Sequence, residues 1–228
     1  ILTLGLPSVV TYQSPTSFST ESFCSVSDDI YGYLHDDEQT MSGSGLDLGI
    51  GRLPVKSVAE ANLMLDKIER YMMRSDLEQS DMRGDWRTYV ALLSDDADPS
   101  QAADIDFAIS SEYLAQTIER QAPWINLDKI YADSYPQQSG TIGSYYPDVN
   151  NALKQRMDYG CLLLNYIGHG ADQYIGTERY MELTDIDNYK NYNSLPFFVT
   201  STCSFGKFDK LDGSRGSEAF VLAPGAGV

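Results

Sequence analysis

Two stretches of the chain are mostly apolar and show no regular alternation of apolar and polar residues. They span residues 162–167 and 195–202, and both are rich in leucine, aromatic or β-branched side chains. Runs of this length and composition are typical of strands buried on both faces of a parallel sheet. The first run ends at Gly168-His169-Gly170 and the second at Cys203. Each predicted strand is therefore followed directly by a side chain that can take part in catalysis.

The rest of the pattern alternates between strands and amphipathic helices. Further strands are predicted at residues 1–5, 46–53, 86–93 and 126–131. Helices are predicted at residues 58–72, 105–121, 148–157, 184–189 and 217–222. Such alternation predicts an α/β fold, with a mostly parallel sheet flanked by helices.

The helix expected after Ser57 has an apolar face. Ser57 and Glu60 stand three residues apart, which is the spacing of a capping box at a helix start. Apolar residues then recur every three or four positions, which predicts one stripe that packs on the sheet. The stripe consists of Val58, Ala61, Leu65, Ile68 and Met72.

The residues that follow the two apolar runs suit nucleophilic catalysis. Parallel neighbouring strands would bring His169 and Cys203 to the same sheet edge, outside the carboxyl ends of the strands, where ligands bind in α/β sheets. A cysteine thiolate is a nucleophile, and an imidazole can take up a proton and return it near neutral pH. The N–H groups of Gly170 and Cys203 are then candidate donors to an oxyanion. The alternatives are a core cysteine and a turn histidine.

A group of aspartates follows the strand predicted at residues 86–93. The spacing differs from that of an EF-hand, because the central glycine and the closing glutamate are missing. One interpretation is that these carboxylates cap the next helix, and the other is that they belong to the site. The aspartates are Asp95, Asp96, Asp98, Asp104 and Asp106.

Four residues are the candidate substrate contacts. Asp104 and Asp106 could contact a basic group of a substrate, while Tyr174 and Thr202 stand close in sequence to His169 and Cys203. For Tyr174 and its neighbours at residues 177–180, plain surface exposure is the favoured alternative.

Charge and cysteine content narrow the range of functions. The 228 residues carry a formal net charge of −17, which argues against binding to nucleic acid, whose phosphates would be repelled. Three cysteines make an odd number, so a disulfide framework is not expected; Cys24 lies in a polar loop and Cys161 opens a buried strand. The proposed chemistry requires no metal or organic cofactor. The acidic residues 36–38 are interpreted as a solvated loop, with a structural calcium ion as the alternative.

The ends of the chain suggest a domain within a longer protein. The opening ILTLG resembles the tail of a strand and the closing PGAGV the start of one. We therefore expect residues 1–228 to form one catalytic domain.

The order strand-His-Gly, spacer, strand-Cys resembles that of the caspase-like cysteine peptidases. The chain is similar to the gingipain-type family in the segment NYIGHG and in the later segment LPFFVTSTCSFGKFD. The segments SDDIYGYLHDDE and IGRLP are also similar to that family. The resemblance implies a caspase-like three-layer sandwich with Cys203 as nucleophile and His169 as base. It also implies that Asp96 takes the place of a glutamate that assists the histidine, although aspartate is shorter by one methylene.

Within that family, the stretches around residues 168–170 and 202–209 resemble the sortase of the bacterial type IX secretion system. This implies an enzyme at the outer-membrane or extracellular surface that removes carboxyl-terminal sorting domains from secreted cargo. It also implies that the new carboxyl end of the cargo is transferred to an amine on a surface glycolipid. Contact with outer-membrane secretion components is implied as well. The alternatives are a general secreted gingipain-like protease and a non-catalytic binding module of a secretion complex. An α/β hydrolase is disfavoured because no G-x-S-x-G motif is present.

Overall fold

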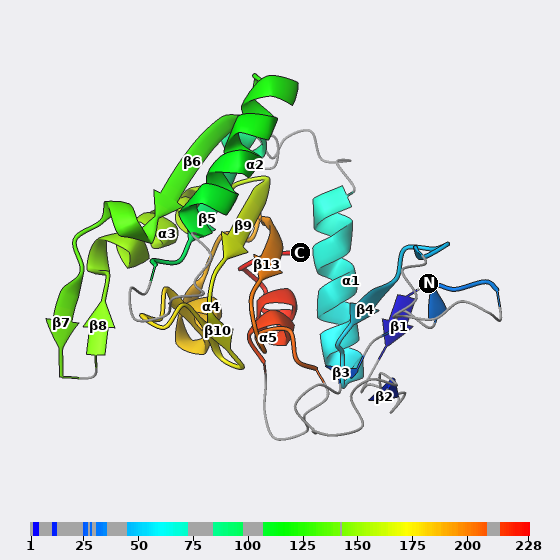
Figure 1. Cartoon of the computed structure of the whole chain (residues 1–228). Coiled ribbons are helices and arrows are strands. Elements are labelled where there is room, and N and C mark those ends of the chain that lie inside the picture. The colour runs from blue at the N-terminus through cyan, green and yellow to red at the C-terminus, as the bar shows by residue number, and fades with distance from the viewer. Residues whose placement is uncertain are drawn as a thin grey trace.

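The computed structural model describes residues 2–4, 11–12, 25–26, 28, 31–35, 45–72, 84–97, 107–141, 143–208 and 215–228. Its centre is a four-stranded, fully parallel sheet with the order β13-β9-β5-β6 (Figure 1). The strands are β5 (Tyr89–Ser94), β6 (Asn126–Tyr131), β9 (Leu163–Ile167) and β13 (Phe197–Ser201). The predicted α/β class and parallel sheet are confirmed.

Helices cover both faces of this sheet and give three layers. On one face, Val90 and Leu92 of β5 pack with Ala115 of α2 (Phe107–Gln121). On the other face, Ala91 and Leu93 join a larger core with residues of α3 (Pro147–Tyr159) and α5 (Gly216–Leu222). Successive side chains of a strand point to opposite faces, so an uninterrupted apolar strand serves both cores.

Shorter elements surround the sheet. Three two-residue strands after β9 form a small antiparallel sheet, β10 (Gly170–Ala171), β11 (Tyr174–Ile175) and β12 (Met181–Glu182). The hairpin β7 (Gln138–Gly140) and β8 (Gly143–Tyr145) extends beside it, and α4 (Leu183–Asn188) follows β12. Two 3₁₀ turns lie at Asp85–Thr88 and Ala132–Ser134.

The amino-terminal part lies beyond α1 (Val58–Met72), on the far side from the main sheet (Figure 1). Here β1 (Leu2–Leu4) pairs in parallel with β4 (Gly51–Leu53), and β2 (Thr11–Tyr12) pairs with β3 (Ser25–Val26). Residues 46–50, predicted as strand, lie outside β4. None of the described helices has the length and hydrophobicity that a membrane span requires.

The start of α1 is as predicted, but its apolar stripe is not buried. Ser57 Oγ accepts a hydrogen bond from the Glu60 N–H at 3.1 Å, which caps the helix. However, Val58 is 78% exposed, Leu65 59% and Met72 69%. The prediction that this stripe packs on the sheet is therefore wrong.

The buried face of α1 is instead the one that carries Met64 and Lys67. Lys67 is fully buried, and its Nζ donates to the carbonyl oxygens of Val221 and Ala223, each at 2.7 Å. The last carbonyls of a helix have no partner within the helix, and those at the end of α5 find one in this lysine. A polar anchor thus decides which face of α1 turns inward, and apolar periodicity does not reveal it.

Lys67 should make stability depend on pH. Burial lowers the pKa of this amine to about 8 from 10.5, so the unfolded chain binds more protons between these values. The free energy of unfolding should therefore rise with pH from about 8 to about 10.5, by an amount on the order of 1 to 3 kcal/mol. Urea unfolding across this range should show the rise in the parent protein and lose it in Lys67→Met. Lys154→Met, at an exposed lysine, is the control; a rise that persists in Lys67→Met would contradict the assignment.

Candidate functional site

The parallel pairing of β9 and β13 places His169 and Cys203 at the same edge of the sheet. Ile167 is paired with Ser201, so each candidate lies two residues beyond this pair. The N–H of Gly168 also donates to the carbonyl of Ser201 at 3.2 Å, which continues the pairing past the end of β9. The shared edge expected from the two apolar runs is therefore what the structure contains.

The loops that carry the two candidates are in contact. A Cβ atom at Gly170 would clash with the Thr202 side chain and would lie 3.2 Å from the Cys203 carbonyl oxygen. Gly170 is the start of β10 and pairs with Ile175 of β11. Only glycine allows the strand after His169 to lie this close to the Cys203 loop.

Cys203 lies on a tight, strained turn. The N–H of Phe205 donates to the Cys203 carbonyl at 2.7 Å, and Ser204 between them has a φ of +58°. A positive φ is unfavourable for a residue with a side chain, so packing must hold this turn. Phe205 is fully buried and so close to Gly216 that a Cβ atom there would clash with its ring. The anchored Phe205 holds the turn with Cys203 exposed.

Cys161 has the opposite environment. It is fully buried in the core, just before the amino-terminal end of β9. Burial raises the pKa of its thiol to about 12, so it is protonated at neutral pH. This contrast with Cys203 agrees with its interpretation as a core residue.

His169 is held through both its main chain and its ring. Its N–H donates to Asp95 Oδ2 at 2.7 Å, and its carbonyl accepts from the Tyr166 hydroxyl at 2.7 Å and from the Gly176 N–H at 2.8 Å. The imidazole meets the Phe107 ring edge to face, with centroids 5.3 Å apart.

Asp95 is the buried carboxylate beneath the site. Its side chain is 1% exposed and also accepts hydrogen bonds from the hydroxyls of Tyr180 at 2.8 Å and Tyr166 at 3.2 Å. Burial raises the pKa of Asp95, and the hydrogen bonds from Tyr180 and His169 oppose that rise. Its own N–H donates to the carbonyl of Ile167, so Asp95 ties the end of β5 to the end of β9.

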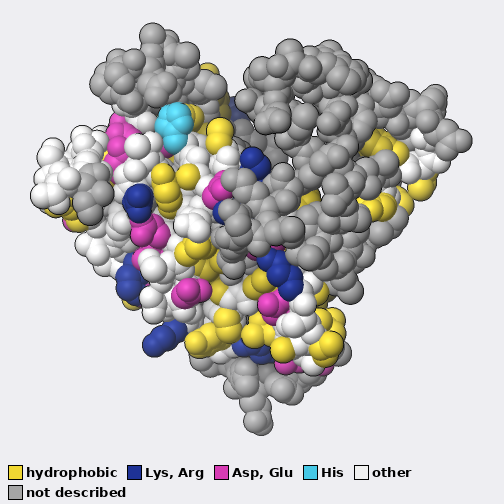
Figure 2. All heavy atoms as spheres, turned by 90° about the horizontal axis from the view of Figure 1, so that it is seen from below, with side chains coloured by type: hydrophobic (Ala, Val, Ile, Leu, Met, Phe, Trp, Pro, Cys, Tyr) yellow, Lys and Arg dark blue, Asp and Glu magenta, His cyan; other side chains and the backbone are white. Residues whose placement is uncertain are grey.

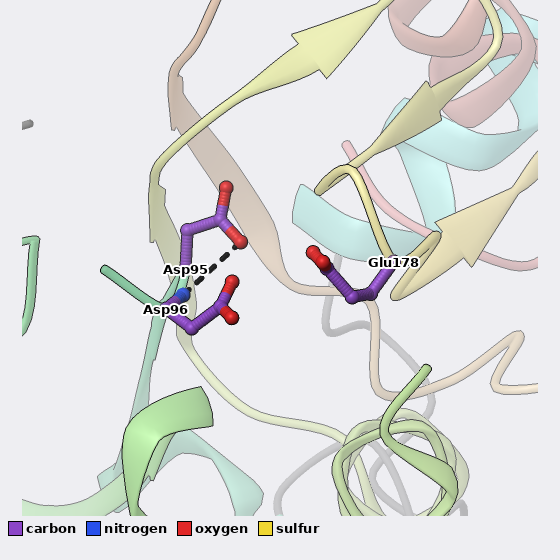
Figure 3. Close-up of side chains that lie close together, drawn as sticks. All are labelled: Asp95, Asp96 and Glu178. Carbon is purple, nitrogen blue, oxygen red and sulfur yellow. Dashed lines mark hydrogen bonds between the residues drawn. The ribbon is translucent and has the colours of Figure 1, made fainter. Parts of the chain in front are cut away.

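Asp96, the residue matched to the histidine-assisting glutamate of the family, lies beside Asp95. Its carboxylate accepts hydrogen bonds from Tyr146 at 2.9 Å, Gln137 at 3.3 Å and Tyr180 at 3.3 Å. Figure 3 shows Glu178, from the loop after β11, pointing toward Asp95 and Asp96. One carboxylate oxygen from each of the three lies within 4.8 Å of the others.

A raised pKa at Glu178 explains how three carboxyl groups can lie so close together. Burial, and then the charge of Asp96, raise the pKa of Glu178 to about 7. Like charges this close disfavour full ionisation, so Glu178 is largely protonated in mildly acidic solution. Oxygen ligands of this kind also suit calcium, but the oxygens of Asp95 and Asp96 already accept hydrogen bonds from tyrosines and amides.

The remaining candidates have mixed positions. Tyr174 is half-buried, with the Arg179 guanidinium 4.7 Å from its ring centroid. Thr202 is half-buried and packs against Gly170. An open pocket of about 510 Å³ lies between the β7–β8 hairpin and residues 177–182, which include Glu178. Other candidates lie outside the described residues, namely Asp98, Asp104, Asp106, Cys24 and the acidic residues 36–38.

Sequence reasoning directed attention to the aspartate loop but overlooked the tyrosines around it. Tyr166 was part of an apolar run, and Tyr180 and Glu178 were interpreted as surface residues. The sequence feature that could have identified Asp95 is its place directly after a predicted strand, at the carboxyl edge of the sheet.

Comparison with known proteins agrees with this arrangement. The model of peptidase family C25 matches residues 5–228. No curated protein sequence matches the chain. The crystal structure of the Arg-specific cysteine proteinase gingipain R (RgpB) superposes with a TM-score of 0.69 and 19% identity, over 97% of this chain and 44% of that chain. The complex of Porphyromonas gingivalis RgpB pro- and mature domains gives 0.65 and 18%, over 97% and 45%.

A third structure, described only as a protease, gives a TM-score of 0.65 and 15% identity over 90% of this chain and 39% of that chain. The present chain thus spans less than half the length of the solved structures that it matches. At these identities the likeness establishes the caspase-like fold, and the family model, which covers nearly the whole chain, establishes the relationship: the chain belongs to peptidase family C25, the gingipain family of cysteine peptidases.

Proposed function

We propose that this domain is the catalytic domain of a cysteine endopeptidase that uses a Cys203–His169 dyad. The observation that supports this most directly is the contact between two loops at the carboxyl edge of β9 and β13. One loop carries a fixed histidine, and the other presents an exposed cysteine on a strained turn.

In this reaction the Cys203 sulfur attacks the scissile carbonyl carbon while His169 takes the thiol proton. The carbonyl oxygen becomes an oxyanion, to which the N–H groups of Gly170 and Cys203 donate. The tetrahedral intermediate collapses, the C–N bond breaks, and His169 returns the proton to the leaving amine. The product is a thioester between Cys203 and the substrate, which water or another amine then cleaves. No metal or organic cofactor takes part in these steps.

The acidic residues are proposed to support this dyad. Asp96 would assist His169; it is the neighbour of Asp95, which accepts a hydrogen bond from the histidine N–H. Asp104 and Asp106 would contact a basic group of the substrate, and Tyr174 and Thr202 would line the cleft.

The finer proposal is a type IX secretion sortase similar to PorU. Such an enzyme would act at the bacterial surface on secreted cargo with a carboxyl-terminal sorting domain, beside outer-membrane secretion components. The sequence around His169 and Cys203 supports this, and a thioester intermediate permits transfer to an amine. On the face seen in Figure 2, Lys and Arg side chains of the described residues are interspersed with Asp and Glu. Together with the net charge of −17, this agrees with protein rather than nucleic acid partners.

A general secreted protease is the second candidate, favoured by the structural likeness to gingipain R. A non-catalytic binding module is less well supported, since both His169 and Cys203 are present at one edge.

A cysteine-directed acylating inhibitor should modify Cys203 and leave Cys161 unmodified. The reason is exposure, because Cys161 is fully buried with a raised pKa. Peptide mapping by mass spectrometry checks the position. Cys203→Ala should reduce kcat by at least about 10³-fold, whereas Cys161→Ala should alter stability but not kcat. Turnover that survives in Cys203→Ala would refute the dyad.

Substitutions of the individual aspartates should affect kcat and KM differently. Asp96→Ala should lower kcat by about 10²-fold because a displaced histidine transfers protons poorly. Asp104→Ala and Asp106→Ala should mainly raise KM. Steady-state kinetics of the single variants measure both quantities, with Asp158→Ala, at a surface residue of α3, as control. Unchanged kinetics in all three would leave these aspartates with a structural role only.

Transfer and hydrolysis can be distinguished by the new carboxyl end of the cargo. The full-length enzyme, incubated with a cargo protein and a small amine, should give an amine adduct visible by mass analysis. The adduct fraction should rise with amine concentration because the amine and water compete for one thioester. A free carboxylate at every amine concentration, with broad cleavage of unrelated proteins, would instead indicate a general protease.

A further inference from the structure

We infer that Asp95 and Tyr166 are positioning residues for the peptidase reaction, because together they hold the main chain of His169 from both sides. This inference rests on the proposed function of His169 as general base. It concerns Asp95 rather than Asp96, and the main chain of the histidine rather than its ring.

The two contacts close around one residue. The N–H of His169 donates to Asp95 Oδ2 at 2.7 Å, and the carbonyl of the same residue accepts from the Tyr166 hydroxyl at 2.7 Å. The hydroxyl also lies 3.2 Å from the same oxygen of Asp95. Both peptide groups next to the histidine Cα are therefore fixed by buried side chains, one directly after β5 and the other within β9.

The neighbouring glycines make this arrangement necessary. Glycine gives a chain wide conformational freedom, and His169 stands between two of them. At Gly168, however, a Cβ atom would clash with Asp95 Cβ and with the Tyr166 hydroxyl. The close approach of these two side chains therefore explains why residue 168 is a glycine. The same contacts restrict the backbone conformations that this glycine could otherwise adopt.

The ring is constrained from a different direction. Phe107, the first residue of α2, contacts the imidazole edge to face at a centroid distance of 5.3 Å. The Asp95–Tyr166 contacts fix where the histidine Cα lies, and Phe107 limits how the ring turns. A base that must reach one thiol needs its position fixed to within about 0.5 Å.

The burial of Asp95 argues against a purely structural explanation. A carboxylate that is 1% exposed is costly to bury and must be matched by hydrogen bonds. The Asp95 carboxylate accepts hydrogen bonds from the hydroxyls of Tyr166 and Tyr180 and from the N–H of His169. An apolar side chain would fill the core without this cost, but it could not accept the hydrogen bond of the His169 N–H.

The test compares Tyr166→Phe with Tyr189→Phe, another buried tyrosine of the same core. Tyr166→Phe should lower kcat by about 10- to 100-fold with KM little changed. It should also increase amide hydrogen exchange at residues 168–170. Alkylation of Cys203 at neutral pH should become slower, since a displaced imidazole takes up the thiol proton less readily. Tyr189→Phe should change none of these quantities.

Asp95 is tested by a pair of substitutions. Asp95→Asn retains an oxygen that can accept from the His169 N–H, so it should keep more activity than Asp95→Ala and show less amide exchange. Equal activity and exchange in the two variants would overturn the inference, as would parent-like kcat, exchange and alkylation in Tyr166→Phe. A parent protein that lacks Cys203-dependent turnover would refute the proposed function instead, and amide exchange would still decide whether Asp95 and Tyr166 hold His169.

Discussion

The parallel register of β9 and β13 is the constraint on which the rest of the site depends. Ile167 lies opposite Ser201, and His169 and Cys203 each follow this pair by two residues. A slip of one residue would turn every side chain of β13 to the other face of the sheet. It would also separate Gly170 from Thr202, whose contact depends on the present register. The apolar character of β9 agrees with its central place in the sheet, but β13 is the outer strand of the described sheet and leaves Phe197 55% and Val199 37% exposed. The prediction that the second apolar run is buried on both faces is therefore wrong.

A second constraint comes from β5, the neighbour of β9 on its other side. The N–H of Asp95 continues the pairing to Ile167, and its carboxylate reaches over the end of β9 to the N–H of His169. Three adjacent strand ends are thereby joined: β13 to β9 through Gly168, and β9 to β5 through Asp95. The sheet acts as a rigid base, and the loops above it inherit its geometry. This is why a histidine between two glycines can occupy a defined position.

The sequence predicted the parts of the structure that depend on local pattern. Residues 126–131 form a strand with the expected bounds, and the apolar runs before His169 and Cys203 form neighbouring parallel strands. The stripe of α1 was misjudged because Lys67, a charged residue, is the one that is buried against α5. The aspartate loop was expected to bring Asp96 or a neighbour close to the site, and Asp95 does accept a hydrogen bond from the His169 N–H, but the tyrosine partners of Asp95 were not predicted. Its partners, Tyr166 and Tyr180, are 71 and 85 residues away along the chain, and no local pattern connects positions so far apart.

If Cys203 forms the proposed acyl-enzyme, its exposure affects how that intermediate would be cleaved. Cys203 is exposed, so among the described residues a thioester formed there would be accessible to solvent. Water is present at about 55 M in bulk, and transfer to an amine therefore requires either a high local amine concentration or exclusion of water. Neither condition is set by the thiol, the imidazole or the carboxylates that surround them. The proposed dyad could thus serve a hydrolase or a transferase, and the outcome would depend on the surface that lies in front of Cys203 when substrate is bound.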